Sequence, residues 1–286
     1  MGQVLFNGLV NGAIIALPAI AFTMLFAILR FANFSVGTFM TVGAYAALTM
    51  NTTMGWPLWL AALMAMAFTA LAFWLSDMIV YKPMREHMSV TLLIVSIAVS
   101  FIVENLIRLG YGNDIQGFDL PLTRPTKWMG LKFTHDQLWI IGVSFTVMIL
   151  VHILLQYTNL GKAMRATADN FNLAEVRGIN TGRVITATWI LGGALIGLAG
   201  VFAGIDLVIE PQMGWNLTIP VFAAAILGGI GSPYGAMLGA IMVGMAEEFT
   251  GTFFSPVYKV AVGFVIIAVL LLFRPQGLLG QPEIKK

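Results

Sequence analysis

Residues 157–182, YTNLGKAMRATADNFNLAEVRGINTG, interrupt a chain that is almost continuously apolar on both sides. The interruption has small residues at helical spacing, glycines at its bends, and the charged residues Lys162, Arg165, Asp169, Glu175 and Arg177. Most connections between helices are much shorter. We therefore expect a structured element that lies outside a membrane and is recognised by another protein.

The composition of the whole chain is typical of a membrane protein. Its 286 residues are 59% hydrophobic and 10% charged, and the mean hydropathy is +0.89. A soluble domain carries about a quarter charged residues. Several apolar runs reach about 20 residues, enough to cross a bilayer as a helix. The first run lacks the basic start and cleavage site of a secretory signal, so we expect it to be retained as a helix.

Apolar length and charged breaks predict an all-α polytopic membrane protein with about seven to nine transmembrane or re-entrant helices. The predicted segments are 4–29, 34–50, 57–81, 90–107, 138–156, 184–205, 217–230, 235–249 and 257–273. Segments 217–230 and 235–249 are short for a span, and they flank the turn signal Gly231-Ser232-Pro233-Tyr234. Either two short helices or one re-entrant hairpin fits this pattern, and the sequence leaves both open.

The basic residues predict the orientation, because cytoplasmic loops carry an excess of Lys and Arg. If the insert is cytoplasmic, ten of the 15 Lys and Arg share its side: Arg30, Lys82, Arg85, Lys162, Arg165, Arg177, Arg183, Arg274, Lys285 and Lys286. The other side holds Arg108, Arg124, Lys127, Lys132 and Lys259. The amino terminus is then outside and the carboxyl terminus is cytoplasmic. Segment 108–137 becomes the largest external loop, either a connector or an interaction surface.

Polar residues at helical spacing occur inside two of the apolar segments. They are Asn7 and Asn11 in segment 4–29, and Ser96, Ser100 and Glu104 in segment 90–107. Polar groups are costly in hydrocarbon unless they face the bundle or water, so we expect both stripes to face inward. There they either join neighbouring helices or line a translocation route. Glu104 and Arg108, four residues apart, also fit a plain ion pair.

Four acidic residues lie near the expected outer ends of the later segments. They are Asp206, Glu210, Glu247 and Glu248. Either each is simply solvated, or together they form an acidic rim on which an external partner docks.

No catalytic or metal-binding pattern is present in the sequence. The chain has no cysteine, and its three histidines are far apart, so a metal cluster is not expected. The nucleotide-binding GxxxxGK[ST], the HExxH and the GxSxG patterns are all absent. Most basic residues flank apolar segments, where they act as topology signals, so no nucleic-acid partner is expected. We expect a transport subunit that is not an enzyme and that receives its energy from elsewhere.

The insert resembles the cytoplasmic coupling loop of ATP-binding cassette (ABC) permeases of the branched-chain amino acid type, specifically of their shorter subunit. The matching positions are Gly161, Arg165, Ala166, Asp169, Asn170, Ala174, Gly178, Ile179 and Asn180. The resemblance extends along the chain through Asn7-Gly8, Asn11-Gly12, Asn33-Phe34 with Gly37, Gly43-Ala44-Tyr45, Gly228-Gly229-Ile230-Gly231-Ser232 and Arg274-Pro275-Gln276-Gly277-Leu278-Leu279-Gly280. It implies one permease domain over residues 1–286, with the coupling loop at 157–182.

One departure from the family pattern concerns the solute. Such permeases commonly carry a histidine in an Asn-Phe-Ala-His-Gly-like run, and here the run is Asn33-Phe34-Ser35-Val36-Gly37. If Asn33 and Ser35 border the route, the preferred solute differs from the family's namesake. Similar permeases carry urea, short amides and aromatic acids.

The resemblance also implies the partners. In this family two permease subunits in the bacterial inner (plasma) membrane act with two cytoplasmic ATPases, which hold ATP and Mg²⁺, and with a periplasmic or extracellular solute-binding protein. This chain itself is expected to bind no cofactor, only lipid and its protein partners. Arg165 and Asp169 share one side of a helix that docks into an ATPase groove. The alternatives are a coupling helix that only lies on the membrane, an ATPase-independent secondary transporter or channel for a solute such as urea or an amide, and a scaffold without a route.

Overall fold

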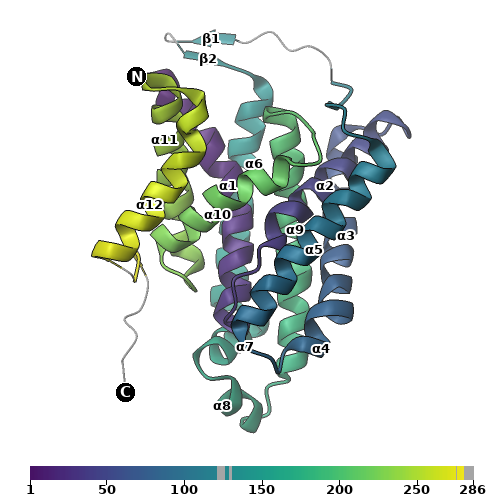
Figure 1. The fold of residues 1–286 in the computed structure, drawn as a ribbon, viewed down its shortest axis with the longest axis vertical. Coiled ribbons are helices and arrows are strands. Elements are labelled where there is room, and N and C mark those ends of the chain that lie inside the picture. Colours follow the sequence, from purple (N-terminus) through teal and green to yellow (C-terminus); the bar gives the residue numbers. More distant parts are fainter. Residues whose placement is uncertain (121–125, 129–130, 275, 280–286) are drawn as a thin grey trace.

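Helix α1 (Gly2–Leu29) forms the centre of a helical bundle (Figure 1). Every residue from 12 to 25 of this helix is buried, as expected for a helix that is apolar on all sides. It is packed against α9 (Thr181–Asp206), α10 (Met213–Gly228) and α11 (Pro233–Phe253). The amino-terminal apolar run is therefore the core of the fold.

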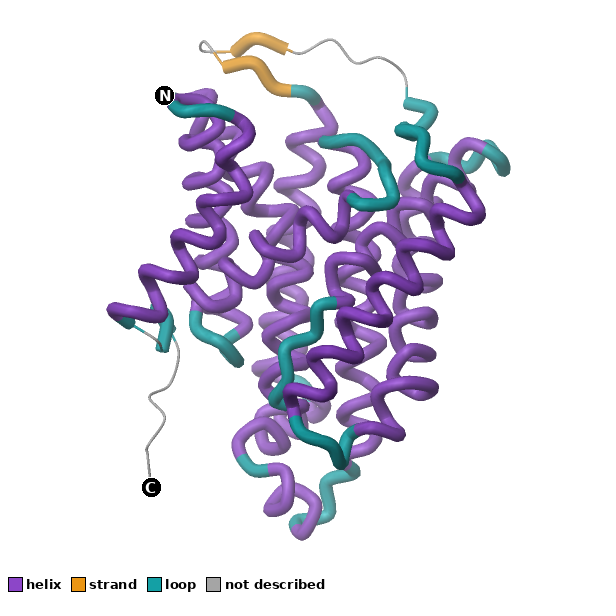
Figure 2. Tube along the Cα trace, viewed as in Figure 1, coloured by secondary structure: helices purple, strands orange, loops and turns teal. Residues whose placement is uncertain are grey.

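The computed structural model describes residues 1–120, 126–128, 131–274 and 276–279. Some positions used in the sequence analysis lie outside this part of the chain; they are Arg124, Pro275, Gly280, Lys285 and Lys286. The described residues are mostly helical, with one small hairpin (Figure 2).

Six helices in the described part are long and apolar enough to cross a membrane. They are α1, the continuous run of α3 (Leu58–Ser76), η1 (Asp77–Tyr81) and α4 (Lys82–Met84), then α5 (Ser89–Tyr111), α6 (His135–Tyr157), α9, and η2 (Pro256–Tyr258) with α12 (Lys259–Phe273). The peripheral helices expose large apolar side chains such as Trp59, Ile102 and Leu272, which a bilayer covers. The prediction of an all-α polytopic membrane protein is confirmed.

The predicted short segments 217–230 and 235–249 are both helical, but their lengths differ. α11 has 21 residues, about 31 Å at 1.5 Å per residue, so the sequence placed both of its ends too far inward. α10 has 16 residues, or about 24 Å. Of these two helices, only α10 is short for a span. Helix α2 (Ser35–Thr52) has 18 residues and is packed between α3, α9 and α10.

Two glycine-containing motifs that are far apart in sequence meet at the turn between α10 and α11. The amides of Leu278 and Leu279 donate to the carbonyls of Leu227 and Gly228, each at 2.9 Å. Gly277 has a φ of +72°, and a Cβ there would lie 2.5 Å from the Gly229 backbone. A side chain is excluded at this crossing, which explains why the motif carries glycine.

The insert and the amino terminus lie at opposite ends of the bundle (Figure 1). At the insert end are α4, α7 (Asn159–Asp169) and α8 (Phe171–Val176). At the other end are the amino terminus and an antiparallel hairpin of β1 (Thr126–Trp128) and β2 (Leu131–Phe133), in which Lys127 pairs with Lys132. The sequence did not predict this hairpin. It also started the outer loop too early, because α5 continues to Tyr111.

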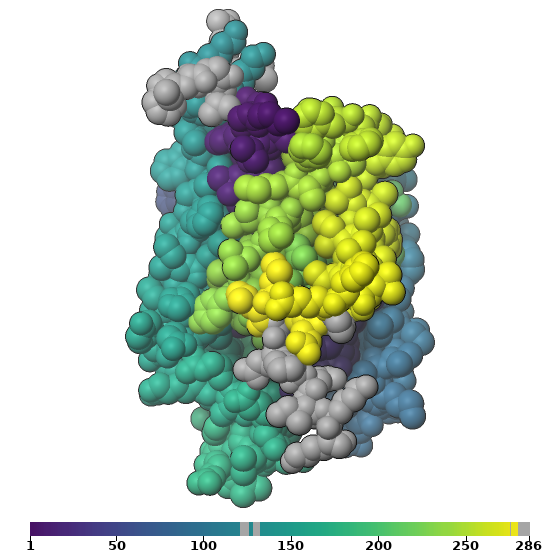
Figure 3. Space-filling view, turned by 90° about the vertical axis from the view of Figure 1, so that its left-hand side faces the viewer, coloured from purple at the N-terminus to yellow at the C-terminus, as the bar shows by residue number. Residues whose placement is uncertain are grey.

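The carboxyl-terminal helices pack beside the start of the chain. In the side view, the amino terminus lies between α6 and the pair formed by α11 and α12 (Figure 3). Phe6 and Phe133, with ring centroids 5.9 Å apart, join α1 to the hairpin at this end.

Candidate functional site

Helix α7 of the insert is fixed to the end of α6 by a cap and a glycine. The Thr158 hydroxyl accepts a hydrogen bond from the Gly161 amide at 3.1 Å, which satisfies an amide of the first turn. A Cβ on Gly161 would lie 2.3 Å from the carbonyl oxygens of both Leu154 and Leu155. Only glycine permits this approach. Gly161, with the buried Met164, therefore forms the inner face of the helix.

Asparagine caps start α8 and the following α9, and a left-handed glycine lies between these two helices. The Asn170 Oδ1 accepts from the Leu173 amide at 3.0 Å, and the Asn180 Oδ1 accepts from the Arg183 amide at 3.0 Å. Gly178 has a φ of +85°, a conformation that costs other residues about 1–2 kcal/mol. Most of the predicted coupling residues therefore shape the backbone of the loop. Two further predicted coupling residues do the same: Ala174 is buried, and the Ile179 amide donates to the Ala174 carbonyl.

The outer face of α7 carries the predicted polar residues. Arg165 and Asp169 are both exposed and lie one turn apart, and Ala166 beside them is partly exposed. Arg165 also donates from Nη1 to the Leu155 carbonyl, so it helps to hold α7 on α6. From the other side, Arg30 at the end of α1 donates to the Ala168 carbonyl at 2.8 Å. The helix is tied to two membrane spans.

Helix α8 presents an apolar surface that the sequence analysis did not assign to a partner. Phe171, Leu173 and Val176 are 40%, 54% and 83% exposed, although the insert is the most polar part of the chain. Exposed apolar clusters of this kind mark interaction sites. The signal was present in the sequence, since these three are the large apolar residues of the otherwise polar stretch 169–177.

The residues of the 33–35 run form a buried polar cluster with Tyr81. The Asn33 Oδ1 accepts from the Ser35 hydroxyl at 2.6 Å and from the Tyr81 hydroxyl at 3.3 Å. The Phe34 amide donates to the Ser96 Oγ at 3.0 Å, which joins this cluster to α5. Tyr81 is supplied by the π-helical turn η1, which the sequence did not predict. Asn33 and Ser35 remain candidates for lining the translocation route, and the contact of Phe34 brings them close to Ser96, another candidate.

The polar stripe of α5 faces inward, as predicted. Ser96, Ser100 and Glu104 are all buried. Glu104 accepts from Arg108 at 2.5 Å, so the ion pair that their spacing left open as an alternative is present. The stripe ends in this pair, at the bundle end opposite the insert.

Asn7 and Asn11 contact two of the acidic residues directly. Asn11 Nδ2 donates to the Glu247 Oε2 at 2.8 Å, and Asn7 Nδ2 donates to the Glu248 Oε1 at 3.1 Å. Glu247 is only 4% exposed, so it does not lie on an exposed acidic rim. Glu248 also accepts from Lys259 at 2.6 Å. These residues form a seam between α1 and α11.

The other two acidic residues lie elsewhere at this end. Asp206, at the end of α9, accepts from Gln137 of α6 at 3.2 Å. Glu210 accepts from Asn216 at 3.4 Å. Both are partly exposed, so Asp206, Glu210 and Glu248 remain the candidates for binding-protein docking.

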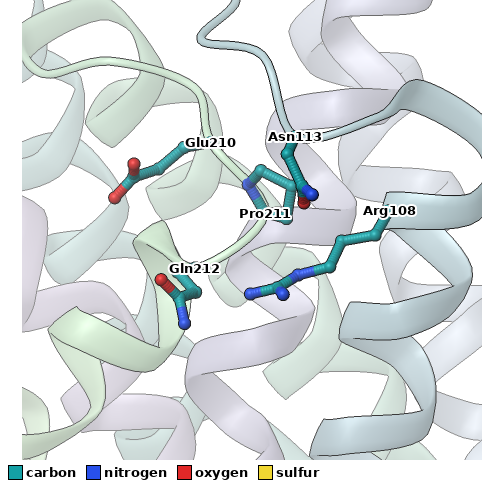
Figure 4. Close-up of a pocket in the computed structure, with 5 residues that line it drawn as sticks. All are labelled: Arg108, Asn113, Glu210, Pro211 and Gln212. Carbon is teal, nitrogen blue, oxygen red and sulfur yellow. The ribbon is translucent and has the colours of Figure 1, made fainter.

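A polar cavity of about 210 Å³ opens at the end opposite the insert, between α5 and the start of α10. It is lined by Arg108, Asn113, Glu210, Pro211 and Gln212 (Figure 4). In Figure 4 the Arg108 side chain extends toward Gln212, whereas the Glu210 carboxylate points away from it. Neither Asn113 nor Gln212 was singled out from the sequence, because neither belongs to a helical stripe.

The glycine and lysine of the insert lie within a regular helix. Among the described residues, no group of three or more His, Cys, Asp and Glu is placed to hold a metal ion. Gly161 and Lys162 lie inside α7, where their amides bond to Thr158. They are not part of an open loop that could wrap a phosphate. The insert provides a contact surface that is rigidly attached to the membrane helices α1 and α6.

An apolar helical bundle with a partly buried polar seam and an anchored polar insert at one end fits a transport permease. The model of the family described as "Branched-chain amino acid transport system / permease component" matches residues 4–272. The high-affinity branched-chain amino acid transport system permease protein LivH of Escherichia coli K12 is 34% identical, covering 99% of this chain and 97% of the relative. The corresponding protein BraD of Pseudomonas aeruginosa is 35% identical with the same coverage. The chain belongs to this permease family.

A solved structure agrees on the fold. PsaBC from Streptococcus pneumoniae, in complex with Fab, superposes with a TM-score of 0.52 at 15% identity, covering 94% of this chain and 91% of the other. The family and the apolar helices together make the chain a multi-pass inner-membrane permease, a transport subunit of a kind that is not itself an enzyme.

Proposed function

We propose that this permease is the transmembrane subunit of an ABC importer for branched-chain amino acids or a related small polar solute. Separate cytoplasmic ATPase subunits, which hold ATP and Mg²⁺, drive it, and an external solute-binding protein supplies the solute. This chain holds no cofactor of its own, and residues 1–286 act as one permease domain. The observation that carries the proposal is the exposed apolar surface of α8 on a rigidly anchored insert.

The surface of α8 fits a groove on a protein partner. Leu173 and Val176 supply exposed apolar area, and Arg165 and Asp169 on α7 supply charge of both signs beside it. A short helical element of this composition binds by burying its apolar residues in a groove, while the charges fix its register. The two coupling helices of a permease pair would in this way occupy two ATPases.

The anchoring of α7 provides a route for movement into the membrane. Gly161 packs on the backbone end of α6, and Arg30 joins the end of α1 to α7. A displacement of α8 by a closing ATPase therefore acts on two spans as one body. This movement requires that the contacts of α7 with α6 and with the end of α1 are rigid. It requires no chemical reaction within the chain.

The distribution of basic residues supports an orientation for the chain. The insert end carries Arg30, Lys82, Arg85, Lys162, Arg165, Arg177 and Arg183. An excess of basic residues favours the cytoplasm. The insert is then cytoplasmic and the amino terminus, at the other end, is outside.

The face formed by α5 and α10 is suited to a second, homologous permease subunit. Asn105 and Asn216 are exposed within these apolar helices, and the rings of Phe101 and Trp215 join the helices with centroids 5.4 Å apart. Exposed amides are costly against lipid tails, so a partner or a water-filled route covers them. The polar cavity at the end opposite the insert opens beside the same helices and is lined by Arg108 and Glu210.

Co-purification with the cognate ATPase tests the proposal. Val176→Asp places a charge on the α8 surface, and we expect at least tenfold less bound ATPase and a matching loss of uptake. Val257→Asp is the matched control, because Val257 is equally exposed, at 82%, but lies in η2, just before α12 and at the bundle end opposite the insert. Normal ATPase binding by Val176→Asp, or uptake by liposomes that lack ATPase subunits, would support the secondary transporter or channel instead.

A further inference from the structure

A second cavity, of about 500 Å³, lies at the insert end of the bundle. It opens between the run from α3 through η1 to α4 and the first turns of α9, which are about 100 residues apart in sequence. Its polar lining residues are Asp77, Lys82, Arg85, Asn180, Arg183 and Thr186. None of them lines the cavity at the opposite end of the bundle or belongs to the buried cluster around Asn33.

The charges of this cavity are predominantly positive. Lys82, Arg85 and Arg183 converge on it, and Asp77 is its sole lining carboxylate. Arg85 donates from one terminal nitrogen to both oxygens of Asp77, at 2.5 Å each, so this anion is already paired. Lys82 and Arg183 have no ion-pair partner among the described residues. The lining carries three cations against one carboxylate.

Neutral groups around the cavity add hydrogen-bond donors. Gly182 lies in the first turn of α9, where amides lack an acceptor within the helix. Thr188 donates to the carbonyl four residues earlier, whereas the Thr186 hydroxyl has no partner among the described residues. The positive end of the α9 dipole points the same way as these donors. Together they suit an anion with several acceptor oxygens.

The remaining walls are apolar and belong to membrane spans. Trp74, Met78 and Ile190 line the cavity, and the last two are 53% and 43% exposed. The cavity lies where the span Leu58–Met84 ends and the span Thr181–Asp206 begins. That is the level of lipid headgroups, where an acyl chain would run along Met78 and Ile190.

We propose that this cavity binds a phosphate group, supplied by an anionic phospholipid of the leaflet at the insert end. The phosphate oxygens lie between Lys82 and Arg183 and accept from Thr186 and the first turn of α9, and the acyl chains cover the apolar wall. The same donors fit a free phosphate, but a free ion leaves that wall exposed. The site depends on membrane embedding and not on the coupling role of the insert.

Lipid retention by the full-length permease, purified with its companion subunits, tests this site. Native mass spectrometry after incubation with mixed phosphatidylglycerol and phosphatidylcholine vesicles measures the preference for the anionic lipid. We expect Lys82→Gln with Arg183→Gln to lower that preference about 25-fold, at about fivefold for each cation. Lys162→Gln, at an exposed cation of α7 outside the cavity, is the matched control and keeps it.

A substitution that is expected to raise lipid retention separates a role in lipid binding from a purely structural effect. Asp77→Asn keeps an acceptor for Arg85 but removes the anion, so we expect phosphatidylglycerol retention to rise about fivefold. Addition of inorganic phosphate alone distinguishes a phospholipid from free phosphate as the source of the bound phosphate group. If it displaces the lipid and Met78→Ser with Ile190→Ser has no effect, the ligand is free phosphate. An unchanged lipid preference in the Lys82 and Arg183 double variant overturns the site, and loss of ATPase binding alone would assign these cations to the ATPase.

Discussion

Asn11 of α1 donates a hydrogen bond to Glu247 of α11, from Nδ2 to Oε2, over 2.8 Å. Glu247 is 4% exposed, and its second oxygen has no partner among the described residues. One turn toward the amino terminus, Asn7 donates to Glu248, which Lys259 also contacts. The two asparagines therefore hold the central helix against α11.

Removal of the Asn11 amide is expected to destabilise the protein. Asn11→Leu leaves the buried Glu247 oxygens without a donor, which costs about 1–3 kcal/mol of unfolding free energy. Glu247→Gln keeps an acceptor for Asn11 and removes a buried charge, so we expect it to be as stable as the wild type or more so. Denaturant unfolding of the permease in detergent measures both.

Asn7→Leu serves as the comparison for this seam. Glu248 keeps its bond to Lys259 and is only partly buried, so the loss is expected to be below about 1 kcal/mol. Equal losses for Asn7→Leu and Asn11→Leu would mean that the burial of Glu247 does not control stability.

Substitution of Gly161 is expected to separate the insert from the membrane helices. The methyl group of Gly161→Ala would meet two carbonyl oxygens at 2.3 Å, so α7 has to move off α6. We expect uptake to fall at least tenfold and hydrogen exchange to rise in α7. Gly142→Ala in α6 is the control, since nothing lies within 4 Å of its Cβ position. If Gly161→Ala exchanges and transports like Gly142→Ala, α7 is not held by this contact.

The helices of this fold were predictable because apolar length determines them. Segments 4–29 and 184–205 agree with α1 and α9 within two or three residues. The hairpin of β1 and β2 was not predictable, because two three-residue strands in a polar loop carry no periodic signal. The same holds for η1, since a π-turn differs from an α-turn in its hydrogen bonds and not in its composition.

The sequence predicted where the candidate site lies. It did not predict which residues of the insert shape the backbone and which are exposed for contact. The motif of the insert identified the loop, yet Gly161, Gly178 and the caps Asn170 and Asn180 shape the backbone, as their contacts reveal. Asn11 and Glu247 were assigned separate roles because residues 236 positions apart carry no sign of being neighbours.

Substitution of Gly178 is expected to act through the backbone alone. Nothing lies within 4 Å of its Cβ position, and its φ is +85°, so Gly178→Ala costs about 1–2 kcal/mol without a clash. Gly178→Asn is tolerated better, because asparagine adopts this conformation more readily. We expect ATPase co-purification to fall in the order glycine, asparagine, alanine. Equal binding by all three would show that the turn at Gly178 does not position α8.

The face of α5 and α10 can be tested through Asn216. Its side chain is exposed and makes one weak contact, to Glu210 at 3.4 Å, so Asn216→Leu is expected to leave the unfolding free energy within about 0.5 kcal/mol. If the amide faces the route or a second permease, uptake falls about tenfold while ATPase binding is kept. Thr146→Leu is the control, because Thr146 is exposed on α6 and its hydroxyl bonds within the helix. Wild-type uptake by Asn216→Leu would mean that lipid covers this face, because a leucine in contact with acyl chains costs the transport cycle nothing.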